Sequence, residues 1–188
     1  MAQPTIRDED QKLRELIVYI AVKCQYDPHF GATWLNKALF YCDFSAFARL
    51  GKSITGAEYF ALDQGPAPRR LLPVRIAMEE QGDVALQKLT KQHRLVPLRE
   101  PDLSIFTPQE IALVDSVLDQ LRTLDADGVS ELSHAFLGWR AAWVEGEAKG
   151  DGNYVTIPYS TTFVSNEPLD EFGQARGREL AARHSWPV

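Results

Sequence analysis

The sequence predicts an α+β fold that is predominantly helical, with a central buried helix, surrounding amphipathic helices and a small β-hairpin or short sheet. Three observations support this prediction. Helical periodicity dominates the N-terminal third, the segment 33–50 is apolar on every side, and two strand-like segments follow a third helix. The chain has 188 residues, 45% of them hydrophobic, which is enough for one sizeable core. We therefore expect a single domain over 1–188.

The first predicted helix spans residues 8–25. Apolar residues recur there at intervals of three and four, the spacing of one buried helix face. They are Leu13, Leu16, Ile17, Ile20, Ala21 and Cys24. Charged residues occupy the other faces at Lys12, Arg14, Glu15 and Lys23. This helix is therefore expected to be amphipathic.

The second predicted helix, 33–50, is expected to lie at the centre of the domain, because a helix that is apolar all round is usually buried. Thr33 is placed to cap its N-terminus, and Gly51 is expected to end it in a left-handed conformation. Lys37 and Asp43 lie near its apolar faces. They are predicted to form a buried pair that supports the fold, with a catalytic role as the alternative.

The connector 51–71 contains a Gly-Lys-Ser sequence. A phosphate-binding loop reads G-x-x-x-x-G-K-[ST] and lies between a strand and a helix. Here Ala57 and Glu58 stand where the lysine and the hydroxyl residue are needed, and a helix precedes the loop. The connector is therefore predicted to contain turns around an extended run at 59–62, with a structural motif of Gly51, Gly56, Gly65 and Pro66.

A third helix is expected over 72–81 with Gly82 at its end, followed by a hairpin of the segments 84–89 and 94–98. The clearest helix start comes next. Thr107 is a predicted N-cap, Pro108 fits the first turn and Glu110 completes a capping box. Phe106 and Ile111 occupy hydrophobic-staple positions, and the buried stripe is Ile111, Val114, Leu118 and Leu121.

The C-terminal third is predicted to be less regular. A helix is expected after Asp127, with Val129, Leu132 and Phe136 facing inward. Residues 145–153 are the best candidate for a mobile loop. An extended or irregular tail is expected at 158–164, and a polar helix at 170–184 completes a C-terminal extension over 157–188.

Composition argues against several function classes. The chain has 20 Lys and Arg against 26 Asp and Glu, a net charge of −6 and a pI near 5.2, which opposes nucleic acid as the main partner. We expect no signal peptide, no membrane span and a cytoplasmic protein. The two cysteines are not a Cys-x-x-Cys pair and the four histidines are scattered, so no disulfide, metal or other cofactor is predicted.

No catalytic site is predicted either, so we expect a protein that is not an enzyme. Cys42 and His134 are interpreted as a core thiol and a helix-surface histidine, because no orienting acid or oxyanion motif accompanies them. Basic residues recur at Arg69, Arg70 and Arg75 and again at Lys88, Lys91, Arg94 and Arg99. They are interpreted as solvated faces, with contact to RNA or DNA as the alternative.

Three segments in a fixed order resemble a known family. They are LNKALFYCDFSAFARLGKSITGAEYFALDQGPAPRRL at 35–71, FTPQEIALVDSVLDQL at 106–121 and VSELSHAFLGWRAA at 129–142. This order resembles the Panacea domain, also called the SocA-like antitoxin domain, with a core at about 33–145. The resemblance implies an antitoxin in a bacterial or phage toxin-antitoxin system, paired with a cognate toxin protein. For some members it implies an adaptor that delivers the toxin to a protease.

The resemblance directs attention to an interface. The stretch 107–131 holds six acids and one base, a net charge of −5, which suits a basic toxin. Asp115, Asp119 and Asp125 are the candidate interface acids, and a solvated helix face is the alternative. The aromatic candidates, expected to be exposed, are Tyr59, Trp139 and Trp143. A nucleic-acid-associated regulator or an enzyme with an unrecognised site stays open as a second function.

Overall fold

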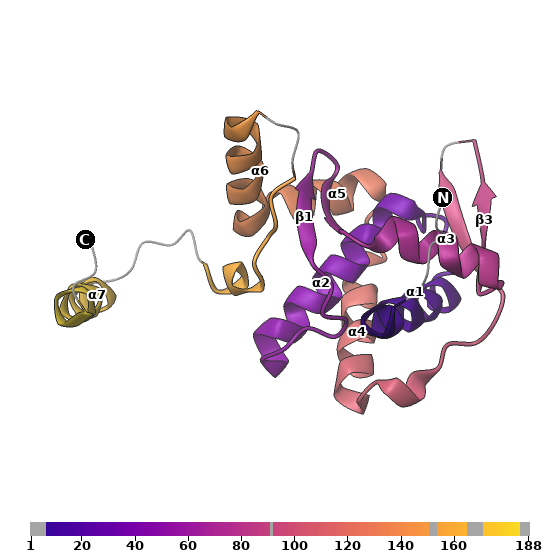
Figure 1. Ribbon diagram of the computed structural model, residues 1–188, viewed down its shortest axis with the longest axis horizontal. Coiled ribbons are helices and arrows are strands. Elements are labelled where there is room, and N and C mark those ends of the chain that lie inside the picture. The colour runs from indigo at the N-terminus through magenta and orange to yellow at the C-terminus, as the bar shows by residue number, and fades with distance from the viewer. Residues whose placement is uncertain (1–6, 91, 151–153, 165–170, 185–188) are drawn as a thin grey trace.

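The protein is described here by a computed structural model, which describes residues 7–90, 92–150, 154–164 and 171–184. The predicted α+β fold, predominantly helical, is confirmed (Figure 1). In chain order the elements are η1 (Asp8–Asp10), α1 (Gln11–Lys23), α2 (Ala32–Leu50), β1 (Tyr59–Leu62), β2 (Gly65–Pro68), α3 (Leu71–Gln81), β3 (Val84–Lys88), β4 (His93–Pro97), η2 (Leu103–Ile105), α4 (Pro108–Leu121), α5 (Ala126–His134), α6 (Leu137–Lys149), η3 (Tyr159–Phe163) and α7 (Glu171–His184).

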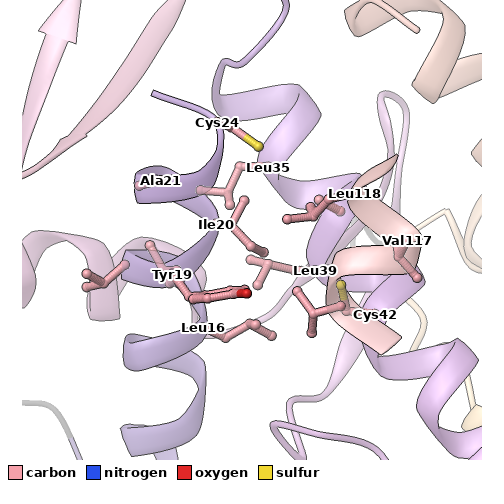
Figure 2. Packing of buried hydrophobic residues seen from close by; sticks show 14 of the residues in the cluster. Leu16, Tyr19, Ile20, Ala21, Cys24, Leu35, Leu39, Cys42, Val117 and Leu118 are labelled. Carbon is pink, nitrogen blue, oxygen red and sulfur yellow. The ribbon is translucent and has the colours of Figure 1, made fainter. Parts of the chain in front are cut away.

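Helix α2 is the central element, as predicted. It packs against α1, α4 and α5 and against β2 and η3, so the rest of the body surrounds it (Figure 1). Figure 2 shows the main core, where Leu16 and Ile20 of α1 lie near Leu35 and Leu39 of α2 and Leu118 of α4. All five side chains are almost completely buried. The apolar residues on every side of α2 therefore have a partner element on every side.

The two ends of α2 differ in how well the sequence predicts them. The helix begins at Ala32, after the extended Gly31, so the prediction that Thr33 is the N-cap is wrong. Thr33 lies inside the first turn. At the other end Gly51 has φ 75°, the predicted left-handed C-cap. Gly82 ends α3 in the same way with φ 76°, also as predicted.

Helix α1 is buried more completely than its pattern predicts. The predicted apolar face is in the core, but Val18, Tyr19 and Glu15 are buried as well. Glu15 accepts hydrogen bonds from both terminal nitrogens of Arg99, at 2.6 and 2.7 Å. A charged residue can leave water here because a guanidinium matches both carboxylate oxygens.

The interpretation of the basic residues as solvated faces is wrong for three of them. Arg70 donates to both carboxylate oxygens of Asp10, at 2.7–3.0 Å. Arg99 bridges Glu15 and Asp83, and Arg94 donates to the backbone carbonyl of Phe30 at 3.2 Å. These arginines tie the hairpin and α3 to the N-terminal region, so their charge serves the fold.

The strands of the described residues form two antiparallel pairs. The predicted hairpin is the pair β3–β4, with Val84 opposite Pro97. In the connector, β1 pairs with β2 from Tyr59 opposite Pro68 to Leu62 opposite Gly65. The sequence analysis predicted β1 but not β2, because its prolines are poor strand formers. The backbone amide of Ala61 also donates to the carbonyl of Val155 at 3.1 Å, which adds a short segment to β1.

Helix α4 begins with the predicted capping box. The Glu110 amide donates to the Thr107 hydroxyl at 3.2 Å, and the Thr107 amide donates to the Glu110 carboxylate at 2.8 Å. The same carboxylate accepts a hydrogen bond from Lys12 at 2.8 Å. The N-terminus of α4 is therefore held both locally and against α1.

Three predictions for the C-terminal third need correction. Leu132 of α5 is 44% exposed, and Ser130 and Ser133 are buried in its place because α5 approaches the β1–β2 turn closely. Residues 145–149, predicted as part of a mobile loop, belong to α6, and 151–153 lie outside the described residues. The tail at 158–164 contains η3. The polar helix α7 is present and stands apart from the body in Figure 1.

Candidate interaction site

The connector is anchored on α2 by Asp43, which is completely buried. Its carboxylate accepts hydrogen bonds from the backbone amides of Ile54 and Thr55, both at 2.8 Å, from the Thr55 hydroxyl at 2.5 Å and from the Tyr59 hydroxyl at 2.7 Å. Burial raises the pKa of Asp43, although these donors act in the opposite direction. The Ser-Ile-Thr-Gly segment at 53–56 is thus held by one buried acid through Ile54 and Thr55.

Lys37 anchors the other half of the connector. Its ammonium is fully buried and donates to the backbone carbonyl of Pro66 at 3.4 Å. The predicted Lys37–Asp43 pair is wrong, because six residues of helix separate them and place them on different faces. Within the described part of the chain Lys12, Lys23 and Lys149 form ion pairs with carboxylates, and Lys37 does not. Burial lowers the pKa of Lys37 to about 8, and Asp63 partly offsets this effect.

Gly65 lies where the β1–β2 turn meets Lys37 and α5. Its φ is 92°, a conformation that favours glycine, and a Cβ atom there would lie 2.4 Å from Ser133 Oγ and 2.8 Å from Lys37 Cε. Gly56 has φ 71° but open space around the position of a Cβ. Of the predicted structural motif, Gly65 and Pro66 therefore contact buried groups, whereas Gly51 and Gly56 provide backbone turns.

The acidic candidates do not form one continuous free face. Asp115 accepts a hydrogen bond from the Tyr19 hydroxyl at 2.8 Å and pairs with Lys23 at 3.0 Å. Asp119 is exposed and lies 3.5 Å from Arg122. Asp125 caps α5 by accepting from an amide in its first turn. The folded chain therefore uses part of the predicted negative charge for internal contacts.

The aromatic candidates have three different environments. Tyr59 is 1% exposed and donates to Asp43, so the expectation that it is exposed is wrong. Trp139 is also largely buried, and its indole N–H donates to the Leu62 carbonyl at 3.0 Å. Trp143 is partly exposed. It stacks on Trp139 with ring centroids 5.4 Å apart, and Trp139 stacks on His134 at 4.2 Å.

A pocket of about 310 Å³ lies beside Trp143, between α6 and the edge of β1. Its lining residues include Trp143, Tyr154 and the acidic residue Glu147. The sequence analysis missed Glu147 and Tyr154 as site residues because they fell in or beside the predicted loop. A continuation of the helical spacing from Trp139 and Trp143 to Glu147 was the signal that could have found the first of them.

Apolar side chains gather on the other side of α6. A groove of about 530 Å³ runs between α6 and η3, with Val144, Thr161 and Val164 among its lining residues. Val144 is 65% exposed, and Phe163 and Val164 are exposed to a similar degree. We use the name α6 face for the exposed or partly exposed apolar and aromatic residues on the two sides of α6 and on the segments beside it: Trp143, Val144, Tyr154, Phe163 and Val164. Exposed apolar groups of this kind are typical of binding surfaces.

Cys42 and His134, which were considered as a nucleophile and base, have different surroundings. Burial raises the pKa of the Cys42 thiol well above its usual range, which disfavours the reactive thiolate. His134 stacks on Trp139. Among the residues described, no group of three or more His, Cys, Asp or Glu side chains is placed to hold a metal ion. In the same residues, no helix is both long and apolar enough to span a membrane.

Comparison with known proteins gives one match. The family model described as "Antitoxin SocA-like, Panacea domain" matches residues 35–140, more than half of the chain. No curated protein and no solved structure matches the chain. The matched region contains α2 from Leu35 onward, both connector anchors and the start of α6, so it includes the buried contacts of the connector. The chain belongs to the antitoxin SocA-like family and carries a Panacea domain.

Proposed function

We propose that this protein is an antitoxin that neutralises a cognate toxin by binding it directly, and that it is not an enzyme. The observation that supports this proposal best is the exposed α6 face in a chain with an antitoxin-like domain. Direct binding is the step that simple blocking and delivery to a protease have in common. We place this encounter in the cytoplasm, where a toxin of this kind would be made.

The α6 face has the composition of a protein-binding surface. Its aromatic members supply large contact areas with few rotatable bonds, and aromatic residues are enriched at the centres of interfaces. Val144 and Val164 add apolar area beside them. Burying such groups against a partner stabilises a complex by about 25 cal/mol for each Å² of apolar surface removed from water, before the costs of association.

The acidic net charge favours a protein partner with a basic surface over nucleic acid. Asp119 of α4 and Asp125 at the start of α5 are exposed, so their charge can attract such a partner over a distance even though Asp119 lies near Arg122 and Asp125 caps α5. Electrostatic attraction of this kind speeds association more than it tightens the complex. We therefore assign the α6 face to contact and the acids of α4 and α5 to attraction.

Co-expression with the product of the adjacent reading frame tests the proposal. Cells producing that product alone should stop growing, and co-production of the wild-type chain should restore growth. The two proteins should also co-purify. Val144→Asp should weaken binding at least about tenfold, equivalent to about 1.4 kcal/mol, because it places a charge in an apolar contact.

Leu72→Asp is the matched control. Leu72 is 56% exposed on a different helix, α3, and should tolerate the same change without loss of binding or growth rescue. Thermal unfolding of both variants should stay close to that of the wild type, since surface changes usually alter stability by no more than about 0.5 kcal/mol. Failure of the wild-type chain to bind or neutralise the adjacent product would contradict the proposal.

A further inference from the structure

We infer that the pocket between α6 and β1 receives one basic side chain, an arginine or a lysine, of the partner protein. This inference rests on the proposed function, since it names the chemistry that the partner presents to the α6 face. The observations behind it are the aromatic walls of the pocket, its carboxylate and the small residues that leave it open.

The aromatic walls are held in place from behind. Trp143 stacks on Trp139 with an interplanar angle of 17°, and Trp139 is fixed by its hydrogen bond to the Leu62 carbonyl. Tyr154 also lines the pocket and packs on Phe60 with ring centroids 5.2 Å apart. Because both rings have a packed neighbour, a bound side chain meets surfaces that are already ordered, which lowers the entropic cost of binding.

Aromatic faces attract cations, and this protein already uses that attraction next to the pocket. The Arg69 guanidinium lies over the Phe60 ring, 5.1 Å from its centroid, and Phe60 is the ring on which Tyr154 packs. Tryptophan is the strongest of the aromatic side chains in such contacts. An arginine or lysine of the partner that lies over Trp143 would therefore make a stronger cation–π contact than the one between Arg69 and Phe60.

The charge at the border of the pocket selects for a cation. Glu147 is exposed and has no ion-pair partner among the described residues. Glu145, two residues earlier on the same helix, is paired with Lys149 at 2.6 Å. Among the described residues, Glu147 is thus available to an incoming cation, whereas Glu145 is already paired. A charge-assisted hydrogen bond to Glu147 would orient a basic side chain lying against the rings.

Small residues make the space. Four of its lining residues, Ala61, Ala142, Gly146 and Gly150, are small, and among the described residues they leave the space open. A volume of about 310 Å³ lies at the lower end of the range for small-molecule sites and suits one long side chain better than a larger ligand. A nucleobase could also stack on Trp143, but the carboxylate and the net charge of −6 oppose its phosphate.

Nuclear magnetic resonance of the isotope-labelled protein tests the inference without the partner. Arginine amide is the probe, citrulline amide is the analogue that lacks only the guanidinium charge, and ionic strength is matched with sodium chloride. The chain has four tryptophans, and Trp143→Phe assigns the indole N–H signal of Trp143. That signal should shift progressively with arginine amide and should shift much less with citrulline amide. Equal shifts with the two amides, or no shift with either, would overturn the inference.

Glu147→Gln and its matched control complete the test. Loss of the carboxylate should weaken the response to arginine amide about twofold to fivefold, the usual range for an exposed ion pair. Glu145→Gln, on the same helix, should leave the response unchanged, because this acid is paired outside the pocket. An equal effect of the two changes would show a general charge effect and would refute a specific site.

Binding and growth rescue with the adjacent reading frame's product separate this inference from the proposed function. If the wild-type chain neutralises that product but Trp143→Ala and Glu147→Gln neutralise it equally well, the pocket inference fails and the proposed function stands. If arginine amide binds at Trp143 but the wild-type chain does not neutralise the product, the proposed function fails and the assignment of a cation pocket stands.

Discussion

Replacing Lys37 with methionine should stabilise the protein at neutral pH. The side chain is fully buried, and its ammonium donates one long hydrogen bond, 3.4 Å, to the Pro66 carbonyl. Burial lowers the pKa of Lys37 from 10.5 to about 8. A difference of about 2.5 units at 1.36 kcal/mol each means that keeping this charge in the folded protein costs about 3 kcal/mol. Methionine has a similar length and carries no charge.

The pH dependence gives the prediction its sign. Below pH 8 the ammonium is charged in both the folded and the unfolded chain, so the full cost is present. Between pH 8 and 10.5 the folded protein releases the proton first, and the cost disappears as the pH rises. The Lys37→Met variant should therefore be more stable than the wild type at pH 7 by about 2 kcal/mol, after the loss of one hydrogen bond worth about 1 kcal/mol. The difference should vanish or reverse above pH 10.

Urea unfolding of the two proteins, followed by circular dichroism at pH 6, 7, 8 and 9, measures this difference. Comparing the two proteins at each pH cancels the contributions of other groups, including the buried tyrosines that titrate in alkali. This prediction would be refuted if Lys37→Met destabilised the protein at pH 7, or if the difference in stability between the two proteins did not change with pH. Either result would mean that the ammonium is stabilised by contacts stronger than the one to Pro66.

The remaining predictions concern the connector and the acidic residues. Gly65→Ala should destabilise the protein by at least about 2 kcal/mol, because the new Cβ would meet Ser133 Oγ. Gly56→Ala should destabilise it by only about 1 kcal/mol, because only the positive φ opposes the alanine. Urea unfolding compares the free energies of unfolding of the two variants. Asp43→Ala should cost about 3–5 kcal/mol, since it leaves four buried donors unpaired, and a loss below 1 kcal/mol would contradict the anchor role. Asp119→Lys should slow association with the adjacent frame's product at low salt and leave the melting temperature nearly unchanged; equal association rates would make it a solvating residue.

Features that depend on neighbouring residues are predictable from the sequence. The capping box of Thr107 and Glu110 involves residues three apart, and Gly51 ends α2 through its own backbone conformation. The central position of α2 follows from its apolar residues on every side. The ordered segments 35–71, 106–121 and 129–142 were also enough to indicate the family, because they lie in one order along the chain.

Features that depend on distant residues required the tertiary structure. Arg99 pairs with Glu15, which is 84 residues away in the sequence, and Arg70 pairs with Asp10, which is 60 residues away. Arginines that look solvated in the sequence therefore form ion pairs with buried acids. Tyr59 is buried because its hydroxyl reaches Asp43 on another element. No local pattern contains this information.

The helical class of this protein, several of its helix ends and its family can be read from local sequence patterns. Only the folded chain shows that Lys37 and Asp43 hold two halves of one connector rather than each other, and that Trp143, Glu147 and Tyr154 line one pocket. The physical reason is the separation along the chain over which each interaction acts. Helix propensity, capping and periodicity act over a few residues, whereas ion pairs, buried hydrogen bonds and pockets form between segments that only the folded chain brings together.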